Sequence, residues 1–434
     1  MLSLSAPVIV AELGWVTMGI VDMVMVGRLG PDAIGAVGIA SSLFIAVGVF
    51  AMGLLLGLDP LVAQAFGARR IDDCHRWLVA GVWLAALATP PTIGVVYLMN
   101  RALPHLGLPP PVVALAQPYL SVVGWSLPPL LLYVAFRRYL QAMNIVRAVT
   151  YTLVIANVTN ALANWVLIFG HYGAPQLGVT GAAWATLASR IVMAAALFVV
   201  ILRHERRMQP RLRETPLALD MPRVRRLVRL GLPAGGQMLL EVGVFASATA
   251  LAGRVSTTAL AAHQIAIQMA SLTFMIPFGL SSAAAVRVGQ AIGRRDPAGA
   301  IAAGWTAIAL GVSFMAAAAL VFLTVPGLLI RMFSADAEVI ALGVRLLFVA
   351  AVFQLFDALQ GVTTGALRGL ADTRTAMLWN LGGHWGVGLP LGYVLCFHAG
   401  YGVVGLWWGL SLGLVICGIS LVTVWRMKGI HLAR

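Results

Sequence analysis

Residues 53–69 read GLLLGLDPLVAQAFGAR, and residues 279–295 read GLSSAAAVRVGQAIGRR. Both stretches begin with Gly-Leu and end in V-x-Q-A-x-G-x-R, at a constant offset of 226 residues. The same offset matches Pro7 with Pro233. Chance identity is expected among Ala, Gly and Leu, but shared Pro, Gln and Arg in one register is not. The two halves of the chain are therefore an internal repeat.

The composition places both halves in a membrane. Of the 434 residues, 60% are hydrophobic and only 10% are charged, whereas soluble domains carry about a quarter charged residues. The net charge of +14 comes from basic residues between apolar stretches, without an aromatic-interleaved patch, which argues against nucleic-acid binding. Three scattered cysteines without CxxC spacing indicate neither a disulfide framework nor a metal site.

About twelve apolar stretches are long enough to span a bilayer, which takes about 20 residues. Their limits are 2–27, 34–58, 77–99, 112–136, 148–170, 179–202, 227–253, 258–286, 300–323, 340–363, 376–397 and 402–425.

The basic residues assign a side of the membrane to each loop. With the N-terminus in the cytoplasm, the odd loops carry only Arg28, Arg101, Arg254 and Arg331. The even loops and the C-terminal tail carry Arg69, Arg70 and Arg76, then Arg137, Arg138 and Arg147, nine arginines between 203 and 229, Arg287, Arg294 and Arg295, Arg368 and Arg374, and Arg426, Lys428 and Arg434. This excess of positive charge predicts that both termini are cytoplasmic.

The polar, basic stretch 203–226 divides the chain. We expect a six-helix bundle over 1–202, a cytoplasmic linker over 203–226 and a second six-helix bundle over 227–434. Six spans per half is an even number, so both halves enter the membrane in the same orientation. Parallel repeats of this kind bind substrates at their interface. The sequence therefore predicts an all-α integral membrane protein, with two parallel six-helix repeats around a central cavity.

Two acidic residues lie deep in the second half. Glu241 is 13 residues before Arg254, about 20 Å from that end of its helix, and Asp357 is 12 residues after Arg345, about 18 Å along. An ionisable group inside a span costs about 3 kcal/mol or more, so both are functional candidates. Two carboxylates at one depth share a proton or a cation. The alternative is that each pairs with a nearby hydroxyl or Arg.

A second polar cluster is expected in the first half. Asp22 lies near the outer end of its span, and Asn160 and Asn164 share one helical face at positions i and i+4. An Asp with two amide carbonyls at one level binds a hard cation or relays protons. Interhelical hydrogen bonding by the two Asn is the alternative. Trp15, on the same face as Asp22, is the counterpart of Glu241 in the repeat.

Other patterns have structural interpretations. Glu12 is either a cavity residue of the first span or a snorkelling or structural carboxylate. The G-x-S-x-G pattern at 409–413 looks like a serine-nucleophile turn, but it lies in the middle of an apolar span and is interpreted as a packing face. The G-x-x-x-G patterns at 53–57 and 231–235 are interpreted in the same way.

Motifs along nearly the whole chain resemble those of the multidrug and toxic compound extrusion (MATE) family, and within it the NorM-like branch. They are VDMVMVG (21–27), VAQAFGAR (62–69), NALANWVLIFG (160–170), AAHQIA (261–266), RVGQAIG (287–293), FQLFDALQ (353–360) and GALRGLADTR (365–374). The resemblance implies two bundles that alternate between outward- and inward-facing states. It also implies export of amphipathic, often cationic compounds by antiport with Na⁺ or H⁺.

The resemblance also implies roles for individual residues. Glu241 and Asp357 would bind the coupling cation in the second half, and Asp22, Asn160 and Asn164 in the first. Transient Na⁺ at these residues is the only metal expected, and no cofactor is expected. The possible cavity residues are Glu12, Trp15, Gln264 and Gln268, of which Glu12 stands where an uncharged polar residue is expected and Gln268 where Asn is common. We expect a monomer in the bacterial inner membrane, with lipophilic cations and the lipid bilayer as its partners.

Two other functions compete with this interpretation. A lipid or polysaccharide-precursor flippase of related fold needs several arginines in its cavity to hold phosphates, and Arg190 is the main deep basic candidate. A membrane enzyme needs a convergent catalytic constellation, and the pattern at 409–413 does not supply one. We therefore expect a transporter and no enzymatic activity.

The arginine distribution yields a topology test. A reporter fused after Arg213 should be cytoplasmic, and one fused near Gly173 should be external, because positive loops are retained inside. Accessibility of the two fusions to an impermeant reagent checks this, and the reverse pattern would overturn the assignment of the spans.

Overall fold

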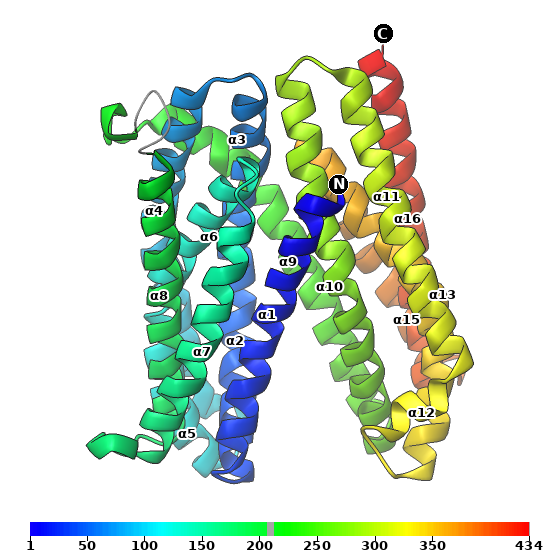
Figure 1. Ribbon diagram of the computed structural model, residues 1–434. Coiled ribbons are helices and arrows are strands. Elements are labelled where there is room, and N and C mark those ends of the chain that lie inside the picture. Colours follow the sequence, from blue (N-terminus) through cyan, green and yellow to red (C-terminus); the bar gives the residue numbers. More distant parts are fainter. Residues whose placement is uncertain (206–211, 434) are drawn as a thin grey trace. The chain divides into compact units, whose positions relative to one another are not determined.

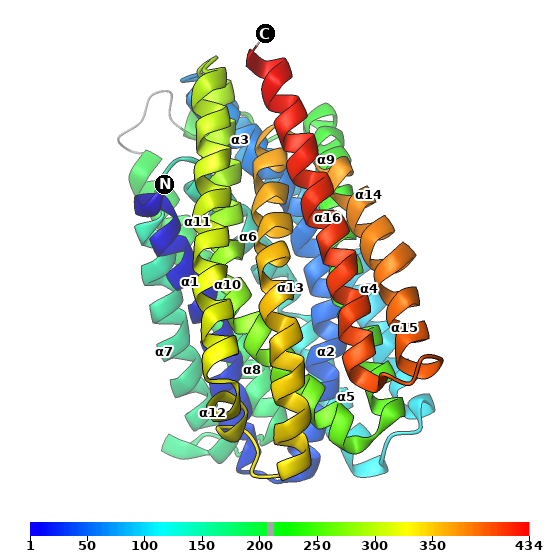
Figure 2. The ribbon, with the colours of Figure 1, turned by 90° about the vertical axis from the view of Figure 1, so that its right-hand side faces the viewer.

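The computed structural model describes residues 1–205 and 212–433, and these contain helices and no strand. The chain forms two compact units. We call Val10–Gly235 the first unit, and Met1–Ile9 together with Gly236–Arg434 the second unit. Figures 1 and 2 show their helices from two directions.

The elements up to residue 214 begin with the long helix α1. They are α1 (Leu2–Gly27), α2 (Pro31–Leu54), η1 (Leu55–Gly57), α3 (Leu58–Gly67), α4 (Ile71–Ala102), η2 (Leu103–Leu106), α5 (Pro110–Gly124), α6 (Leu127–Ala142), α7 (Arg147–Phe169), η3 (His171–Gly173), α8 (Val179–Glu205) and η4 (Leu212–Glu214). The elements after them are α9 (Met221–Val255), α10 (Thr257–Gly293), α11 (Pro297–Thr324), α12 (Pro326–Arg331), α13 (Ala337–Gly369), α14 (Arg374–Asn380), the π-helical η5 (Leu381–Gly388), α15 (Leu389–Phe397) and α16 (Gly402–Ala433).

The expected spans are present as helices. Among the described residues, ten helices are long and apolar enough to cross a membrane, and there are eleven such spans if the pair α5 and α6, bent by 45°, is counted as one. These correspond to eleven of the twelve expected stretches. The other stretch, 376–397, is helical throughout but is divided among α14, η5 and α15, each shorter than 18 residues.

The repeat reappears in the ends of the helices. α3 ends at Gly67 and α10 at Gly293, and the following helices α4 and α11 also begin 226 residues apart. In both halves the residue two positions after that glycine, Arg69 or Arg295, is left-handed with φ 59°. The next N–H then bonds to the carbonyl five residues back, at 2.9 Å from Arg70 and 3.0 Å from Asp296. This hydrogen bond closes a helix C-terminus in a Schellman-type turn, so the shared motif encodes the same helix stop twice.

The two G-x-x-x-G patterns pack against one another, which confirms their interpretation. A Cβ on Gly231 would overlap the backbone of Leu54, and a Cβ on Gly53 would overlap the backbone of Gly235. Glycine therefore lets α9 approach α2 at backbone contact.

The boundary between the two units lies inside α9, later in the chain than the expected linker. The expected boundary lay in the linker 203–226, but the division falls inside α9, between Gly235 and Gly236, because the first part of α9 packs on α2. Residues 206–211 of the expected linker lie outside the described residues. At the other end of the chain, Met1–Ile9 belongs to the second unit, where Ile9 packs against Gly279 and its neighbours.

Three arginines assigned to loops are buried inside helices instead. Arg137 and Arg138 are buried within α6, and Arg368 is buried in the last turn of α13, where it donates to Ser281 Oγ at 3.4 Å. The loop assignment of these residues was wrong, because an arginine at the end of an apolar stretch has the same sequence signature whether it faces water or a buried carboxylate.

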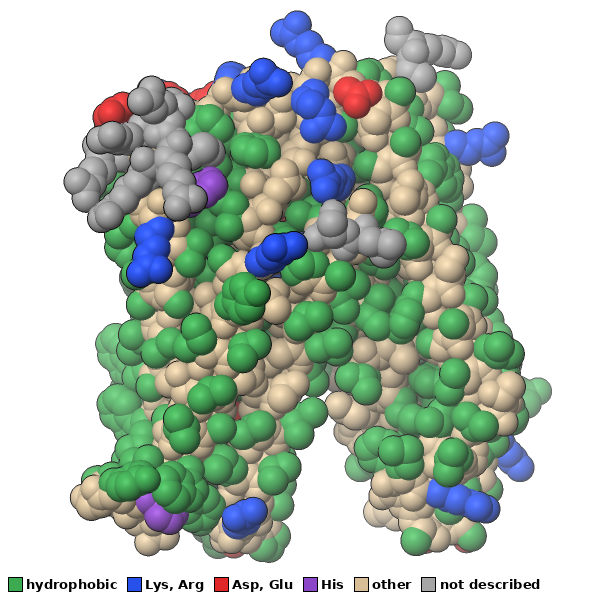
Figure 3. All heavy atoms as spheres, viewed as in Figure 1, with side chains coloured by type: hydrophobic (Ala, Val, Ile, Leu, Met, Phe, Trp, Pro, Cys, Tyr) green, Lys and Arg blue, Asp and Glu red, His purple; other side chains and the backbone are tan. Residues whose placement is uncertain are grey.

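The outer surface is apolar in its middle. Figure 3 shows hydrophobic side chains over most of the visible face and Lys and Arg side chains mainly toward the ends of the helices. Exposed large hydrophobic residues include Leu98, Tyr151, Val158 and Leu320. A surface of this kind is solvated by lipid rather than by water.

The close approach of α9 to α2 predicts the effect of one methyl group. Gly231→Ala should lower the free energy of unfolding by about 1–3 kcal/mol, because the added Cβ overlaps the Leu54 carbonyl. Thermal unfolding of the purified protein measures this. Gly19→Ala is the control, because no atom lies within 4 Å of its added Cβ, and helix propensity makes it neutral or slightly stabilising. Equal unfolding temperatures for the two variants would refute the packing argument.

Candidate cation and substrate sites

The second unit contains a pocket of about 310 Å³ that both predicted acids line. α9 contributes Glu241, Val242 and Phe245, and α13 contributes Phe353, Asp357 and Gln360. The remaining lining residues are Ile267, Ala270, Ser271, Phe274 and Met275 of α10 and His384 of η5. The structure therefore brings Glu241 and Asp357 together, as their matching depths predicted.

Glu241 is held by amides. Its Oε1 accepts a hydrogen bond from Gln237 Nε2 at 3.3 Å and a second from the Nε2 of Gln360. Gln360 also donates to Asn380 Oδ1 at 3.0 Å, and Asn380 donates to the carbonyl of Ala376 at 2.9 Å. This series of hydrogen bonds connects the Glu241 carboxylate on α9 to α13 and α14. No cation is among the partners of Glu241 in the described residues.

Asp357 differs from Glu241 in its partners. The described residues give its carboxylate no hydrogen bond or ion pair, and the nearby charge that acts on it is Glu241. A buried carboxylate that accepts no hydrogen bond needs a proton or a cation to offset its lost hydration. Asp357 is therefore the candidate of this pocket for binding a proton or a cation.

The polar neighbours of the acids were missed as site residues. Gln237 is one turn before Glu241, and Gln360 is one turn after Asp357, so each shares a helical face with its acid. Asn380 is fully buried in the stretch that forms the broken helix. A count of polar residues at i±3 and i±4 from each buried acid would have found the two glutamines.

The first unit holds the second predicted cluster. Asn164 Nδ2 donates to Asp22 Oδ1 at 2.5 Å and lies 3.2 Å from Asn160 Oδ1. Thr186 Oγ1, on α8, is 3.2 Å from Asp22 Oδ2 and also 3.0 Å from the carbonyl of Ala182. Both asparagines are fully buried. Asp22, Asn160 and Asn164 thus form one cluster, as predicted, and Thr186 completes it.

Two buried polar atoms of this cluster have no hydrogen-bond partner among the residues that the structure describes. They are the carbonyl oxygen of Asn164 and the amide nitrogen of Asn160. A buried amide oxygen beside a carboxylate is a suitable ligand for a small hard cation. The cluster can therefore do more than join α1 to α7.

Arg190 lies one turn after Thr186 on α8. Its guanidinium donates to Ser126 Oγ and stacks over the ring of Phe44, 4.5 Å from the centroid. The ring of Trp15 is 6.0 Å away and stacks on Tyr133. Trp15 therefore lies against an arginine in the first unit.

Glu12 is paired with a buried arginine. Its carboxylate is buried and forms an ion pair with Arg137 of α6. One residue along α6, Arg138 lies 3.5 Å from Asp59 of α3. A third pair follows the same pattern, since Glu205 of α8 accepts from Tyr139 of α6 at 2.6 Å and lies 2.7 Å from His75. Three consecutive residues of α6 thus contact buried carboxylates on α1, α3 and α8, and the ion pair of Glu12 agrees with the structural alternative for this residue.

The other candidates lie outside the pocket. Gln264 and Gln268 are exposed on α10 and do not line it. His263 is fully hydrogen-bonded instead: Trp407 Nε1 donates to its Nδ1 at 3.0 Å, and Thr249 Oγ1 lies 2.9 Å from its Nε2. Ser411 is buried and donates to the carbonyl of Trp407 at 2.8 Å, as expected for a packing face.

Comparison with known proteins identifies the family. The chain matches the MatE family over residues 7–166 and 233–394, segments that start at the repeated prolines. A probable multidrug resistance protein NorM from Mesorhizobium japonicum is 40% identical, over 98% of this chain and 93% of its own. One from Brucella suis is 38% identical, over 100% and 93%. The crystal structure of the eukaryotic MATE transporter AtDTX14 covers 99% of this chain and 97% of its own, with a TM-score of 0.87 at 20% identity. The chain is therefore a multi-pass membrane protein of the MATE transporter family, in its NorM-like branch.

Proposed function

We propose that the chain exports amphipathic, often cationic small molecules, including drugs, by antiport with Na⁺ or H⁺. The observation that carries the proposal is the pair of carboxylates, Glu241 and Asp357, in one pocket with aromatic walls. The relatives named as probable multidrug resistance proteins support the same class of substrate.

The chemistry of the pocket favours a lipophilic cation. Phe245, Phe274 and Phe353 offer ring faces, and no Lys or Arg is among the described residues that line it. A cation near an aromatic face gains about 0.5–2 kcal/mol from the ring, in addition to its attraction to the carboxylates. The same lining disfavours a flippase of phosphate-bearing lipids, which would need arginines here.

Competition for one carboxylate would couple the two ligands. Asp357 has no partner among the described residues, whereas two glutamines fix Glu241. Entry of H⁺ or Na⁺ at Asp357 would remove the charge that holds the drug and so release it. If only loaded forms change between outward- and inward-facing states, the ion gradient then drives export. No covalent step is needed, so the proposal includes no enzymatic activity.

The first unit would supply a second ion-responsive site. Asp22 with Asn160, Asn164 and Thr186 offers carboxylate, amide and hydroxyl oxygens at one level. Protonation or Na⁺ binding there would loosen the hydrogen bonds that join α1 to α7 and α8. We place the protein in the bacterial inner membrane as a monomer, with both termini in the cytoplasm, because the remaining loop arginines follow the positive-inside rule.

The carboxylate pair yields the sharpest test of the coupling mechanism. Glu241→Gln and Asp357→Asn should each lower drug export by about tenfold or more, the effect of losing about 1.4 kcal/mol of binding. Both changes keep shape and remove charge, so the unfolding temperature should hold or rise. The double variant should be little worse than either single one, because the residues act as a unit.

Vesicles with an imposed Na⁺ or H⁺ gradient measure this and identify the ion. Glu338→Gln is the matched control, because Glu338 is an exposed carboxylate at the start of α13. Wild-type export in both single variants would sink the proposed mechanism, and additive losses would indicate two independent sites.

The first-unit cluster yields a separate prediction. Asp22→Asn should impair export while expression stays normal, and Thr186→Val should have a smaller effect, because it removes one of the hydrogen bonds to Asp22. Thr159→Val should be neutral, since that hydroxyl bonds only within its own helix, to Ile155. Transport assays on all three variants check this order. Full export by Asp22→Asn would reduce the cluster to helix packing.

A further inference from the structure

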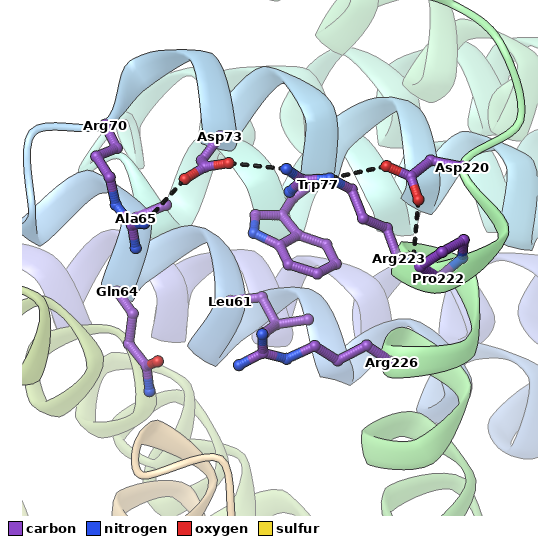
Figure 4. Close-up of a pocket in the computed structure, with 10 residues that line it drawn as sticks. All are labelled: Leu61, Gln64, Ala65, Arg70, Asp73, Trp77, Asp220, Pro222, Arg223 and Arg226. Atoms are coloured by element: carbon purple, nitrogen blue, oxygen red, sulfur yellow. Dashed lines mark hydrogen bonds and ion pairs between the residues drawn. The ribbon is translucent and has the colours of Figure 1, made fainter.

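A second pocket, of about 530 Å³, lies in the first unit and belongs to neither site above. Figure 4 shows it between α3, α4 and the start of α9. Its lining residues are Leu61, Gln64, Ala65, Arg70, Asp73, Trp77, Asp220, Pro222, Arg223 and Arg226.

One arginine of this pocket, Arg223, forms ion pairs with two aspartates and so connects α9 to α4. Arg223 lies 2.9 Å from Asp73 of α4 and 3.0 Å from Asp220, and its guanidinium sits 4.7 Å from the centre of the Trp77 ring. The segment before α9 is also tied down, since Trp83 Nε1 donates to the carbonyl of Leu217 at 2.9 Å. These contacts account for Arg223 and both aspartates without any ligand.

Arg226 takes no part in these ion pairs. It lies one turn beyond Arg223 on α9 and is exposed, with no carboxylate partner among the described residues. Its guanidinium lies 5.8 Å from the centre of the Trp77 ring. In Figure 4 its side chain passes below Trp77 toward Gln64, and Arg70 points into the same space from the other side. Arg70 pairs with Asp73 at 3.2 Å but remains exposed.

The charges do not balance in this pocket. Three arginines against two aspartates leave one positive charge, and Figure 4 shows the guanidinium groups of Arg226 and Arg70 on the side of Trp77 where Gln64 lies. Tryptophan and basic residues at the ends of transmembrane helices are typical of the headgroup region, and basic pockets between such helices bind anionic headgroups. Arginine matches phosphate oxygens by its forked donors.

We propose that this pocket binds the phosphate group of a small anionic ligand, with Arg226 and Arg70 holding the phosphate and Trp77 as its apolar wall. Two sources carry this chemistry: the headgroup of an anionic phospholipid and a free phosphate. The site is distinct from the carboxylate pocket in charge and in ligand, so it does not depend on the proposed export function.

Calorimetric titration of the purified full chain tests the proposal, with dihexanoyl phosphatidylglycerol and inorganic phosphate as separate probes. The wild type should bind at least one of them, and Arg226→Gln should weaken that binding about tenfold. Arg225→Gln is the matched control: this neighbour is an equally exposed arginine of α9 that does not line the pocket, and its loss should change the affinity less than about twofold. Binding of phosphatidylglycerol alone assigns the site to a lipid headgroup, and binding of both probes shows that the phosphate suffices.

Either of two results would overturn the site. One is the absence of binding of both probes to the wild type. The other is an equal loss in Arg225→Gln and Arg226→Gln, which would indicate diffuse surface charge. Arg70→Gln provides a second variant, which leaves Asp73, Arg223 and Asp220 unchanged, and it too should weaken binding. Unfolding temperatures measured without probe separate lost binding from lost folding.

Discussion

A carboxylate inside an apolar helical bundle needs a cation or hydrogen-bond donors beside it, because its lost hydration is otherwise not replaced; without them it takes up a proton. The acids of this chain use these options in different places. Glu12 and Asp59 each lie beside an arginine of α6. Asp22 accepts hydrogen bonds from an amide and a hydroxyl. Asp357 has neither kind of partner in the described residues and faces a pocket. The same constraint therefore separates acids that are paired between helices from one that faces a pocket without such a partner among the described residues.

Close packing by small residues positions these groups. The indole of Trp385 lies against Gly243 and donates to the carbonyl of Leu240 at 3.0 Å, which holds the π-helical stretch against α9. On its other side, this stretch packs Gly383 and Gly388 against the small residues of α16. A π-helical turn is wider than an α-helical one and often lies at functional sites. Here it brings His384 to the wall of the carboxylate pocket.

Much of this arrangement was predictable from local patterns, and the errors have a common cause. The repeat, the order of the helices and the meeting of Glu241 with Asp357 follow from residue types and from distances along single helices. The pairing of Arg137 with Glu12 does not, because the two are 125 residues apart and nothing in either segment identifies the partner. The close contact of α9 with α2 is not evident from the sequence for the same reason. Gly231 looks like a packing residue, but the sequence does not say that α2 is what it packs on.

The two halves of the repeat share their helix ends, but they differ in the residues at the candidate site. Helix ends recur at an offset of 226 residues, down to the left-handed Arg69 and Arg295. At the same offset, however, Glu241 corresponds to Trp15, whose ring faces Arg190 rather than a free carboxylate. The first unit therefore has an arginine near the position where the second unit has an acid. The repeated backbone therefore carries a carboxylate at this position in the second unit and an aromatic ring beside an arginine in the first, so the chemistry of this position differs between the two units.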